Sequence, residues 1–293
     1  YEQWGVDLLQ RVRGMFTFVI WDKNKQELFG ARDHFGIKPF YYAKMNGTFM
    51  YASEIKSLLR HPDFVKELNA EALKPYMTFQ YPAIGETFFK GVYKLPEGHY
   101  FTYRDGKMDI HRYYDEDFRE GKQKLGELVN SIDQTVCDSV KAHQIADVEV
   151  GSFLSSGVDS SYVAAVARPQ HAYSIGFGKG TYNESQQAGE LAELLKLNNT
   201  AESLTDEEAF AAFPRIQWHL DEPDSNPSCV PLYFLSALAA KDVKVVLSGE
   251  GADELFAGYI DYGVHTKFRP IKVVTRWLTH LPAGARKAIA RFC

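Results

Sequence analysis

The sequence lacks several features that mark secreted and membrane proteins. Its 293 residues include only three cysteines, Cys137, Cys229 and Cys293, an odd number at wide spacing that favours reduced thiols over a disulfide framework. No apolar run approaches the roughly 18 residues that a membrane-spanning helix needs. The first residues have neither the basic start nor the apolar core of a secretory signal. These absences predict a cytoplasmic protein with no membrane partner.

An excess of positive charge is also absent. The chain has 33 basic and 38 acidic residues, a net charge of -5, so no broad basic face exists to neutralise phosphates and nucleic acid is not expected as a partner. The nine histidines are scattered without metal-ligand spacing, which argues against structural zinc. With 45% hydrophobic residues the composition is that of a globular protein, and the length suggests two domains.

The first hundred or so residues contain short β-type segments separated by turn sequences. The pair Asn46-Gly47 lies between two of them and favours the left-handed conformations that a tight hairpin needs. We predict an antiparallel sheet assembly with few helices, in which the aromatic residues form the core. The predicted strands are residues 15–21, 27–32, 40–43, 48–52, 92–95 and 99–103, and the aromatic core residues are Phe16, Phe18, Trp21, Phe40, Tyr41 and Tyr42.

The pattern changes after the polar stretch 115–124, where apolar residues begin to recur every three or four positions on one helix face (Leu125, Leu128, Ile132, Val136 and Val140). Strands and helices then alternate, which argues for βαβ units on a parallel sheet. Strands are predicted at 148–154, 171–177 and 243–247, and helices at 158–167, 184–195, 206–219 and 231–241. The predicted domains are residues 1–120 and 121–293, and the tail beyond Tyr262 is basic and predicted to be partly helical.

The strongest chemical signal is residues 154–161, Leu-Ser-Ser-Gly-Val-Asp-Ser-Ser, at a junction of strand and helix. There, free backbone N–H groups and the helix dipole favour an anion, and Gly157 lets the main chain approach a phosphate. No Gly-Lys-Ser/Thr follows, so the segment is not a Walker A loop. A serine-rich helix cap, which needs only one of these serines, remains an alternative.

A second loop, residues 248–254, reads Ser-Gly-Glu-Gly-Ala-Asp-Glu and follows the apolar strand 243–247. It therefore lies at the carboxyl edge of the predicted sheet, where ligands bind in open α/β folds. Glycines with carboxylates suit a loop that holds magnesium through oxygen ligands. An acidic helix N-terminus stabilised by its dipole is the alternative. Together, the two loops predict a nucleoside triphosphate with its metal.

These motifs carry a family resemblance. Residues 155–161 resemble the pyrophosphate loop of PP-loop ATP pyrophosphatases, whose usual pattern is Ser-Gly-Gly-x-Asp-Ser, and residues 248–259 narrow the resemblance to glutamine-hydrolysing asparagine synthetases. Residues 13–16, 32–39 and 52–56 resemble the later part of that family's class II glutaminase domain, and residues 174–177 and 221–223 also resemble family segments. The resemblance implies an α+β, antiparallel Ntn-hydrolase-type domain followed by an α/β, PP-loop adenine-nucleotide α-hydrolase-like parallel sheet domain.

The resemblance also implies a reaction and its residues. ATP would activate aspartate as β-aspartyl-AMP, and ammonia from glutamine would complete asparagine, with ATP and Mg2+ as cofactors; a homodimer is compatible with it. Glu250 matches the catalytic acid, and Asp159 and Asp253 match the magnesium-associated carboxylates. The matched ATP-binding residues are Leu154, Ser155, Gly157, Asp159, Ser160, Ser161, Ile175, Ser248 and Gly249.

Three departures from the family pattern stand out. Ser156 replaces a glycine, which would cost about 1 kcal/mol if the main chain there needs a positive φ. The chain starts at Tyr1 where the family has its N-terminal cysteine nucleophile, and it stops before the lysine-bearing segment of the synthetase site. We expect a fragment truncated at both ends that neither hydrolyses glutamine nor completes synthesis alone.

Other interpretations stay open. A related PP-loop synthetase that forms another amide or a β-lactam would have the same loops, and a non-catalytic scaffold could retain the fold. Asp221, Glu222 and Asp224 belong to the substrate side of the cleft or to a solvated loop. Arg32, Asp33 and Lys38 are interpreted as an internal salt-bridge network rather than as catalytic groups.

Overall fold

The computed structural model describes residues 1–81, 83–117, 121–177, 184–259 and 262. The chain forms two compact units, and each of them is built from segments that are not contiguous in the sequence. The first contains the described residues of Tyr1–Ile145, Phe177–Tyr182 and Ser203–Lys241. The second contains the described residues of Ala146–Gly176, Asn183–Glu202 and Asp242–Cys293. The predicted basic, partly helical tail beyond Tyr262 lies outside the described residues. None of the helices in the described part of the chain combines the length and apolar character that a bilayer crossing requires.

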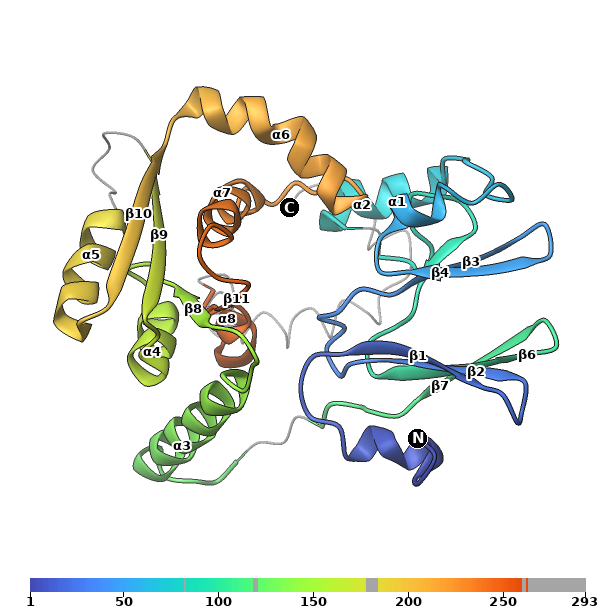
Figure 1. Ribbon diagram of the computed structural model, residues 1–293, viewed down its shortest axis with the longest axis horizontal. Coiled ribbons are helices and arrows are strands. Elements are labelled where there is room, and N and C mark those ends of the chain that lie inside the picture. The colour runs from blue at the N-terminus through green and yellow to red at the C-terminus, as the bar shows by residue number, and fades with distance from the viewer. Residues whose placement is uncertain (82, 118–120, 178–183, 260–261, 263–293) are drawn as a thin grey trace, which may run out of the picture. The chain divides into compact units, whose positions relative to one another are not determined.

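The first unit contains two antiparallel sheets (Figure 1), as predicted. Their hairpins close tightly because the turn residues adopt left-handed conformations: Asn46 and Gly47 have φ of 50° and 83° between β3 and β4. One sheet has the order β1-β2-β6-β7, made of β1 (Thr17–Asp22), β2 (Glu27–Arg32), β6 (His99–Arg104) and β7 (Lys107–Arg112). The other has the order β4-β3-β5, made of β3 (Tyr41–Met45), β4 (Thr48–Ala52) and β5 (Val92–Lys94).

Aromatic side chains fill much of the core of this unit. Phe29 and Phe101 are 1% and 0% exposed, and Phe40 packs against Phe101 with ring centroids 5.4 Å apart. Phe16 and Phe18 pack against the cluster around Phe29, which confirms the expectation of an aromatic core for them. Trp21 is an exception, since it is 48% exposed near the end of β1.

The helices of the first unit are α1 (Ile55–Leu58), α2 (Leu73–Phe79), α3 (Leu125–His143), α6 (Asp206–Leu220) and α7 (Cys229–Ala239), with short 3-10 turns at Gly5–Gln10 and Ala70–Ala72. The predicted helix after the polar stretch is therefore present as α3. Its apolar face is buried only toward the C-terminal end, where Val140 is 7% exposed, whereas Leu125 is 77% exposed.

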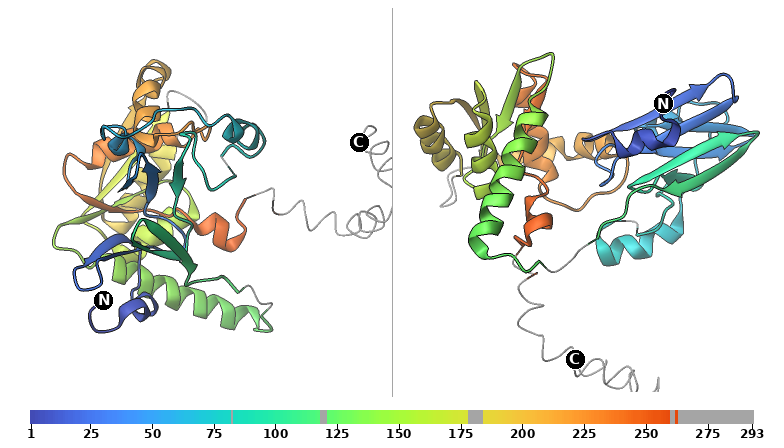
Figure 2. Two further views of the ribbon diagram at one scale, coloured as in Figure 1. Left: turned by 90° about the vertical axis from the view of Figure 1, so that its right-hand side faces the viewer. Right: turned by 90° about the horizontal axis from the view of Figure 1, so that it is seen from below.

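The second unit is built on a sheet of order β10-β9-β8-β11, seen from further sides in Figure 2. Strand β8 (Val150–Phe153) pairs in parallel with β9 (His171–Phe177) and with β11 (Val245–Leu247). Helices α4 (Val158–Ala167) and α5 (Glu184–Leu195) cover one face, where their buried alanines (Ala164, Ala188 and Ala192) pack with Ala172 of β9 and with Leu154. Helix α8 (Ala252–Phe256) follows β11. This is the predicted parallel α/β arrangement.

Strand β10 (Asn198–Leu204) was not predicted. Its sequence is polar, and along the strand only Leu204 is buried, because β10 is the edge strand beyond β9. An edge strand of this kind carries no apolar alternation by which the sequence could reveal it. Its presence completes the sheet and sets the strand order.

That strand order places a switch point between β8 and β11. From β8 the chain proceeds through α4 to β9 and through α5 to β10, and it then returns to the opposite side of β8 as β11. In open α/β sheets, the crevice outside the carboxyl ends of the strands at such a point is the usual ligand site. Both loops singled out in the sequence begin here.

Candidate nucleotide site

Leu154 fixes the end of β8. Its N–H donates to the carbonyl oxygen of Tyr173 at 2.8 Å, and its own carbonyl oxygen accepts from the Ser174 hydroxyl at 2.7 Å. The Leu154 side chain is 3% exposed and packs with Ala164 and Ala188 in the core beneath α4 and α5. Leu154 can therefore face a ligand only through its main chain.

The serines after Leu154 bond mainly to one another and to the loop. The Ser155 and Ser160 hydroxyl oxygens are 2.7 Å apart, and the Ser155 N–H donates to Ser160 Oγ at 3.2 Å. Gly157 N–H donates to Ser155 Oγ at 3.1 Å, and Ser161 Oγ donates to the Gly157 carbonyl at 2.6 Å. The hydroxyls thus hold the loop in a compact conformation. A bound anion could accept hydrogen bonds from these hydroxyls in place of their present partners within the loop.

Helix α4 begins without a side-chain cap. Its N-cap is Gly157, which has no side chain, and no side-chain cap hydrogen bond is made to the N–H groups of the first turn, so the alternative of a simple serine cap is wrong. The N–H groups of the first helical turn have no partner within a helix. An uncapped N-terminus of a ten-residue helix therefore leaves these donors for an anion, which the helix dipole also favours.

The cost foreseen at Ser156 does not arise. Ser156 is not among the residues with positive φ, and Gly157 itself has an extended conformation with φ of -70°. A Cβ at Gly157 would lie 3.2 Å from Ser155 Oγ, so a side chain at this position would require the Ser155 hydroxyl to shift. Serine and glycine are thus equally compatible with the backbone at position 156.

The second loop leaves the neighbouring strand at the same edge. Leu247 of β11 is paired with Ser152 of β8, so both strands end side by side. The Glu250 N–H donates to Ser248 Oγ at 3.4 Å, and Gly251 adopts φ of 93° where α8 begins. Ser248 and Glu250 are exposed, whereas Asp253 in the first turn of α8 is half-buried.

The two loops touch at Gly249. A Cβ at this glycine would lie 2.7 Å from the backbone nitrogen of Ser160 and 2.9 Å from both the carbonyl carbon and the Cβ of Asp159. The main chain of the second loop therefore packs directly on the first turn of α4, at a separation that only glycine permits. This contact brings Asp159 and Ser160 beside Ser248–Glu250, as the common sheet edge led us to expect.

The remaining predicted site residues lie in the same unit. Ile175 is half-buried on β9. The Asp253 carbonyl oxygen accepts from the Gly258 N–H at 2.9 Å, and its carboxylate lies against Gly258. Within the described ranges no three His, Cys, Asp or Glu side chains gather into a metal-binding set. A groove of about 590 Å³ between α4 and α5 adjoins the first loop and is lined by Ser156, Val158, Ser161, Tyr162, Ala165, Gln187 and Leu191.

In the first unit, Arg32 and Asp33 bind main-chain groups instead of forming the salt-bridge network that we expected. Asp33 is 2% exposed, and its carboxylate accepts from the N–H groups of Ile37 and Lys38, both at 2.9 Å. Arg32 donates to the carbonyl oxygens of Lys38 and Leu95 at 2.8 and 2.7 Å, and its burial lowers the pKa of its guanidinium. These residues shape the turn after β2.

The side chains of Asp221 and Glu222 are also buried, so a solvated loop is the wrong interpretation for these two. Their partners are Lys56 and Lys94. The Asp224 carboxylate accepts from the Asn226 N–H at 2.9 Å, and its main chain forms two hydrogen bonds of 3.2 Å with the Gln217 side chain of α6. No sequence signal pointed to either lysine, because each lies more than a hundred residues from its acid.

The parallel sheet with a serine-glycine loop at its switch point is an α/β architecture of the PP-loop type, and the same chain carries an antiparallel unit. The family model for asparagine synthase matches residues 131–288, and the model for a glutamine amidotransferase domain matches residues 1–114. The chain belongs to the asparagine synthase family.

Individual relatives agree with this placement. The chain is 38% identical over 294 residues to asparagine synthetase [glutamine-hydrolyzing] 1 of Bacillus subtilis, covering 99% of this chain and 45% of that protein. It is 38% identical over 308 residues to a putative asparagine synthetase [glutamine-hydrolyzing] of Mycobacterium tuberculosis, again covering 99% of this chain and 45% of that protein. It is also 30% identical over 289 residues to amidase chry2 of Gibberella zeae, covering 88% of this chain and 42% of that protein. The chain thus spans less than half the length of these relatives.

Proposed function

We propose that this chain carries the nucleotide site of a glutamine-dependent asparagine synthetase, with residues 1–120 as glutaminase part and 121–293 as synthetase part. The aspartate side-chain carboxylate attacks the α-phosphorus of ATP, which forms β-aspartyl-AMP and releases pyrophosphate. Ammonia, released when water hydrolyses the glutamine amide to glutamate, attacks the acyl carbon and displaces AMP to give asparagine. The family membership and the glutamine-hydrolysing relatives support this reaction.

The observation that carries the proposal is the contact of Gly249 with Asp159 and Ser160 at the switch point. It supports a site in which the uncapped turn of α4 and the hydroxyls of Ser155, Ser160 and Ser161 bind the pyrophosphate part of ATP. The site would also include the main chain at Leu154 and Gly157, Ile175 beside the adenosine, and Ser248 with Gly249 on the opposite side. Donors aimed at the departing pyrophosphate lower the barrier because charge accumulates there.

Magnesium is part of the same proposal. The described residues contain no group of three His, Cys, Asp or Glu side chains that could hold a metal ion, so phosphate oxygens would complete the coordination of the magnesium. Asp159 in the first turn of α4 and Asp253 in the first turn of α8 supply the carboxylate oxygens that Mg2+ prefers. When bound, the ion would neutralise polyphosphate charge.

Glu250 is the proposed catalytic acid-base residue. It is exposed in the loop that faces α4, and its own N–H is turned to Ser248 Oγ at 3.4 Å. Its carboxylate could accept a proton from the amine as the new C–N bond forms, a role that needs hydrogen-bond reach to the reacting nitrogen. We also propose a cytoplasmic protein, with a homodimer as an assembly to be tested.

Nucleotide binding by the 293-residue chain tests the site directly. Calorimetry with ATP and Mg2+ should give binding that Ser160→Ala and Asp159→Asn each weaken about tenfold, since each removes one polar partner of a charged ligand. Ser156→Gly is the matched control in the same loop and should leave the affinity within about threefold, because position 156 needs no special backbone conformation. Equal affinities in all four proteins would refute the site.

The substrate is tested by pyrophosphate release from the complete enzyme. Aspartate should support release with ATP and ammonia, and a panel of other carboxylic acids should not. One of the relatives is named an amidase and not an asparagine synthetase. Pyrophosphate release with a different acid would therefore favour another amide or a β-lactam as the product. Absence of ATP binding would favour the scaffold interpretation.

A further inference from the structure

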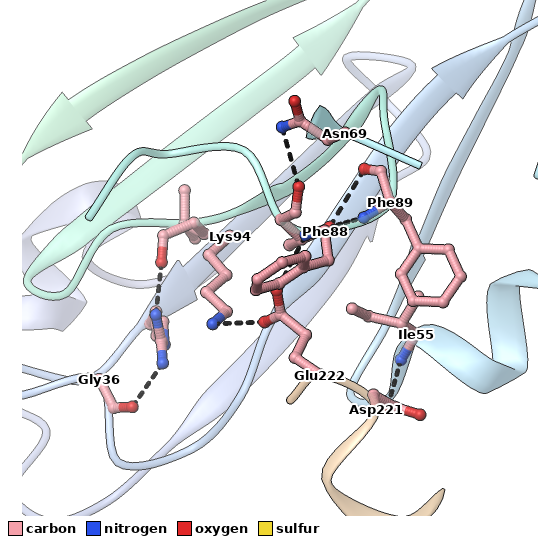
Figure 3. A network of polar contacts seen from close by, with 11 residues as sticks. Gly36, Ile55, Asn69, Phe88, Phe89, Lys94, Asp221 and Glu222 are labelled. Atoms are coloured by element: carbon pink, nitrogen blue, oxygen red, sulfur yellow. Dashed lines mark hydrogen bonds and ion pairs between the residues drawn. The ribbon is translucent and has the colours of Figure 1, made fainter. Parts of the chain in front are cut away.

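Two adjacent carboxylates, Asp221 and Glu222, are buried just after α6. Their side chains are 7% and 8% exposed. Two neighbouring charges are expensive to remove from water unless each is paired and hydrogen-bonded. Both conditions are met by residues that lie far away in the sequence, in the first hundred residues (Figure 3).

Asp221 binds the start of α1. Its Oδ2 accepts from the Ile55 N–H at 2.7 Å, and its Oδ1 accepts from the Lys56 N–H at 3.3 Å. The Lys56 ammonium is 3.0 Å from Oδ1 and donates to the His219 carbonyl at 3.2 Å. The local N-cap of α1, Glu54, makes no side-chain cap, so Asp221 takes its place from 166 residues away.

Glu222 binds the segment that leads into β5. Its Oε1 accepts from the Phe88 N–H at 3.0 Å, and its Oε2 is 2.6 Å from the Lys94 ammonium. The segment itself is fixed by Asn69, whose amide donates to the Thr87 carbonyl at 3.0 Å. The Glu222 carboxylate therefore binds a backbone donor and a lysine at the same time. Asp221 and Glu222 each form an ion pair with one lysine, Lys56 and Lys94.

The backbone at Asp221 supports a specific role. Asp221 has φ of 64°, a left-handed conformation that residues other than glycine seldom adopt, and Pro223 follows. Such a conformation persists when the surrounding contacts determine it. The chain is bent there so that two successive side chains reach two different segments.

The two groups of partners belong to different family models. Ile55, Lys56, Phe88 and Lys94 lie in the part matched by the glutamine amidotransferase model, whereas Asp221 and Glu222 lie in the part matched by the asparagine synthase model. After Glu222 the chain continues through α7 and residues 240–244 directly into β11 and the loop of Ser248 and Gly249. The chain that leads to one side of the nucleotide site is thus anchored to α1 and to the segment that forms β5, both in the part matched by the amidotransferase model.

We propose that Asp221 and Glu222 are positioning residues that fasten the α6–α7 connection to the amidotransferase part of the chain and so couple glutamine use to amide formation. The coupling half of this inference rests on the proposed function, and the fastening does not. Neither acid is placed on a substrate; both act through the backbone of residues 55–56 and 88.

Hydrogen exchange on the 293-residue chain tests the fastening without any activity. Asp221→Asn should accelerate exchange of the Ile55 amide, and Glu222→Gln that of the Phe88 amide, by about tenfold, because each amide loses a charged acceptor. Glu54→Gln is the matched control: Glu54 also pairs with Lys56, at 3.3 Å, but is 53% exposed and binds neither amide. Unchanged exchange in Asp221→Asn and Glu222→Gln would overturn the inference.

The coupling is tested in the complete enzyme, supplied either with glutamine or with ammonia. We expect Asp221→Asn and Glu222→Gln to form more glutamate per asparagine and to lose glutamine-dependent synthesis at least about fivefold more than ammonia-dependent synthesis, with Glu54→Gln unchanged. Parallel losses with both nitrogen sources would reduce the acids to a structural role and refute coupling. If the unaltered enzyme makes no asparagine even from ammonia, the proposed function fails while the exchange result still decides the fastening.

Discussion

At position 249, a single methyl group would collide with backbone atoms of Asp159 and Ser160 rather than with a side chain that can rotate away. We therefore expect Gly249→Ala to push the second loop off α4 and to weaken ATP binding at least about tenfold, measured by calorimetry. Gly189→Ala in α5 is the control, since a Cβ there meets nothing within 4 Å. It should stabilise the protein by up to about 1 kcal/mol through helix propensity. Equal nucleotide affinity in the two variants would contradict the close packing of the loops.

Tyr173 gives a residue-level pH dependence. It is fully buried, and this burial, followed by the nearby Asp242 carboxylate, raises the pKa of Tyr173 to about 12. Because an unfolded tyrosine ionises near 10, stability from the neutral phenol is complete below about pH 10 and is lost as the pH rises toward 12.

Urea unfolding at pH 9 and pH 11.5 measures this effect. The wild type should lose up to about 2 kcal/mol more than Tyr173→Phe between the two pH values, since phenylalanine cannot ionise. At pH 9 the variant should be somewhat less stable, because it lacks the hydrogen bond to Asp242 at 3.2 Å. Identical pH profiles for the two proteins would show that Tyr173 does not stay neutral.

Among the elements, α6 depends on a capping box. The Thr205 hydroxyl accepts from the Glu208 N–H at 3.2 Å, and the Glu208 carboxylate accepts from the Thr205 N–H at 3.0 Å. The Thr205 N–H, followed by its hydroxyl, lowers the pKa of Glu208. The stabilising effect of the ionised Glu208 is therefore present at neutral pH and is lost as the pH falls through its lowered pKa.

Replacing Thr205 by alanine should lower Tm by about 2–4 °C at pH 7, because one N-terminal amide of α6 loses its acceptor. The difference should shrink in acid as Glu208 is protonated. Ser228→Ala is the matched control, since Ser228 occupies the N-cap of α7 without a side-chain cap and should shift Tm by less than about 1 °C. Thermal unfolding followed by circular dichroism compares the two. Equal shifts would mean that the box contributes nothing.

The elements also differ in how well the sequence predicted them. Helices α4 and α5 and strand β9 begin and end where the sequence predicted, and all three contribute buried residues to one core cluster. The pattern of α3 predicted a helix correctly but not its burial, since Leu125 and Leu128 are 77% and 40% exposed. Periodicity indicates which face is apolar, whereas only packing decides whether that face is covered.

At the scale of the whole molecule, two of the long-range ion pairs that hold distant segments of the first unit lie in different surroundings. Lys94 and Glu222 are 2.6 Å apart, with side chains 37% and 8% exposed. Arg13 and Asp138 are also 2.6 Å apart, but are 63% and 66% exposed. Solvent screens the second pair and not the buried acid of the first.

Lys94→Met leaves Glu222 buried without its cation, so we expect it to lower the free energy of unfolding by about 2–3 kcal/mol. The loss is smaller than for a fully buried pair because Lys94 is partly exposed. Arg13→Met should cost less than about 1 kcal/mol, and 0.5 M salt should abolish that cost. Urea unfolding with and without salt measures both. Similar costs for the two variants would show that the buried acid does not depend on its lysine.

The sequence by itself determined the two kinds of architecture, the tight hairpins and the two loops at one sheet edge. These depend on local rules: period, turn residues, and a parallel sheet that brings strand ends together. Only the tertiary structure decided that Gly249 lies on α4, that Ser156 needs no left-handed backbone, and that Asp221 and Glu222 are buried. Their partners are more than a hundred residues away, and no local pattern specifies which distant lysine or amide a carboxylate meets when the chain folds.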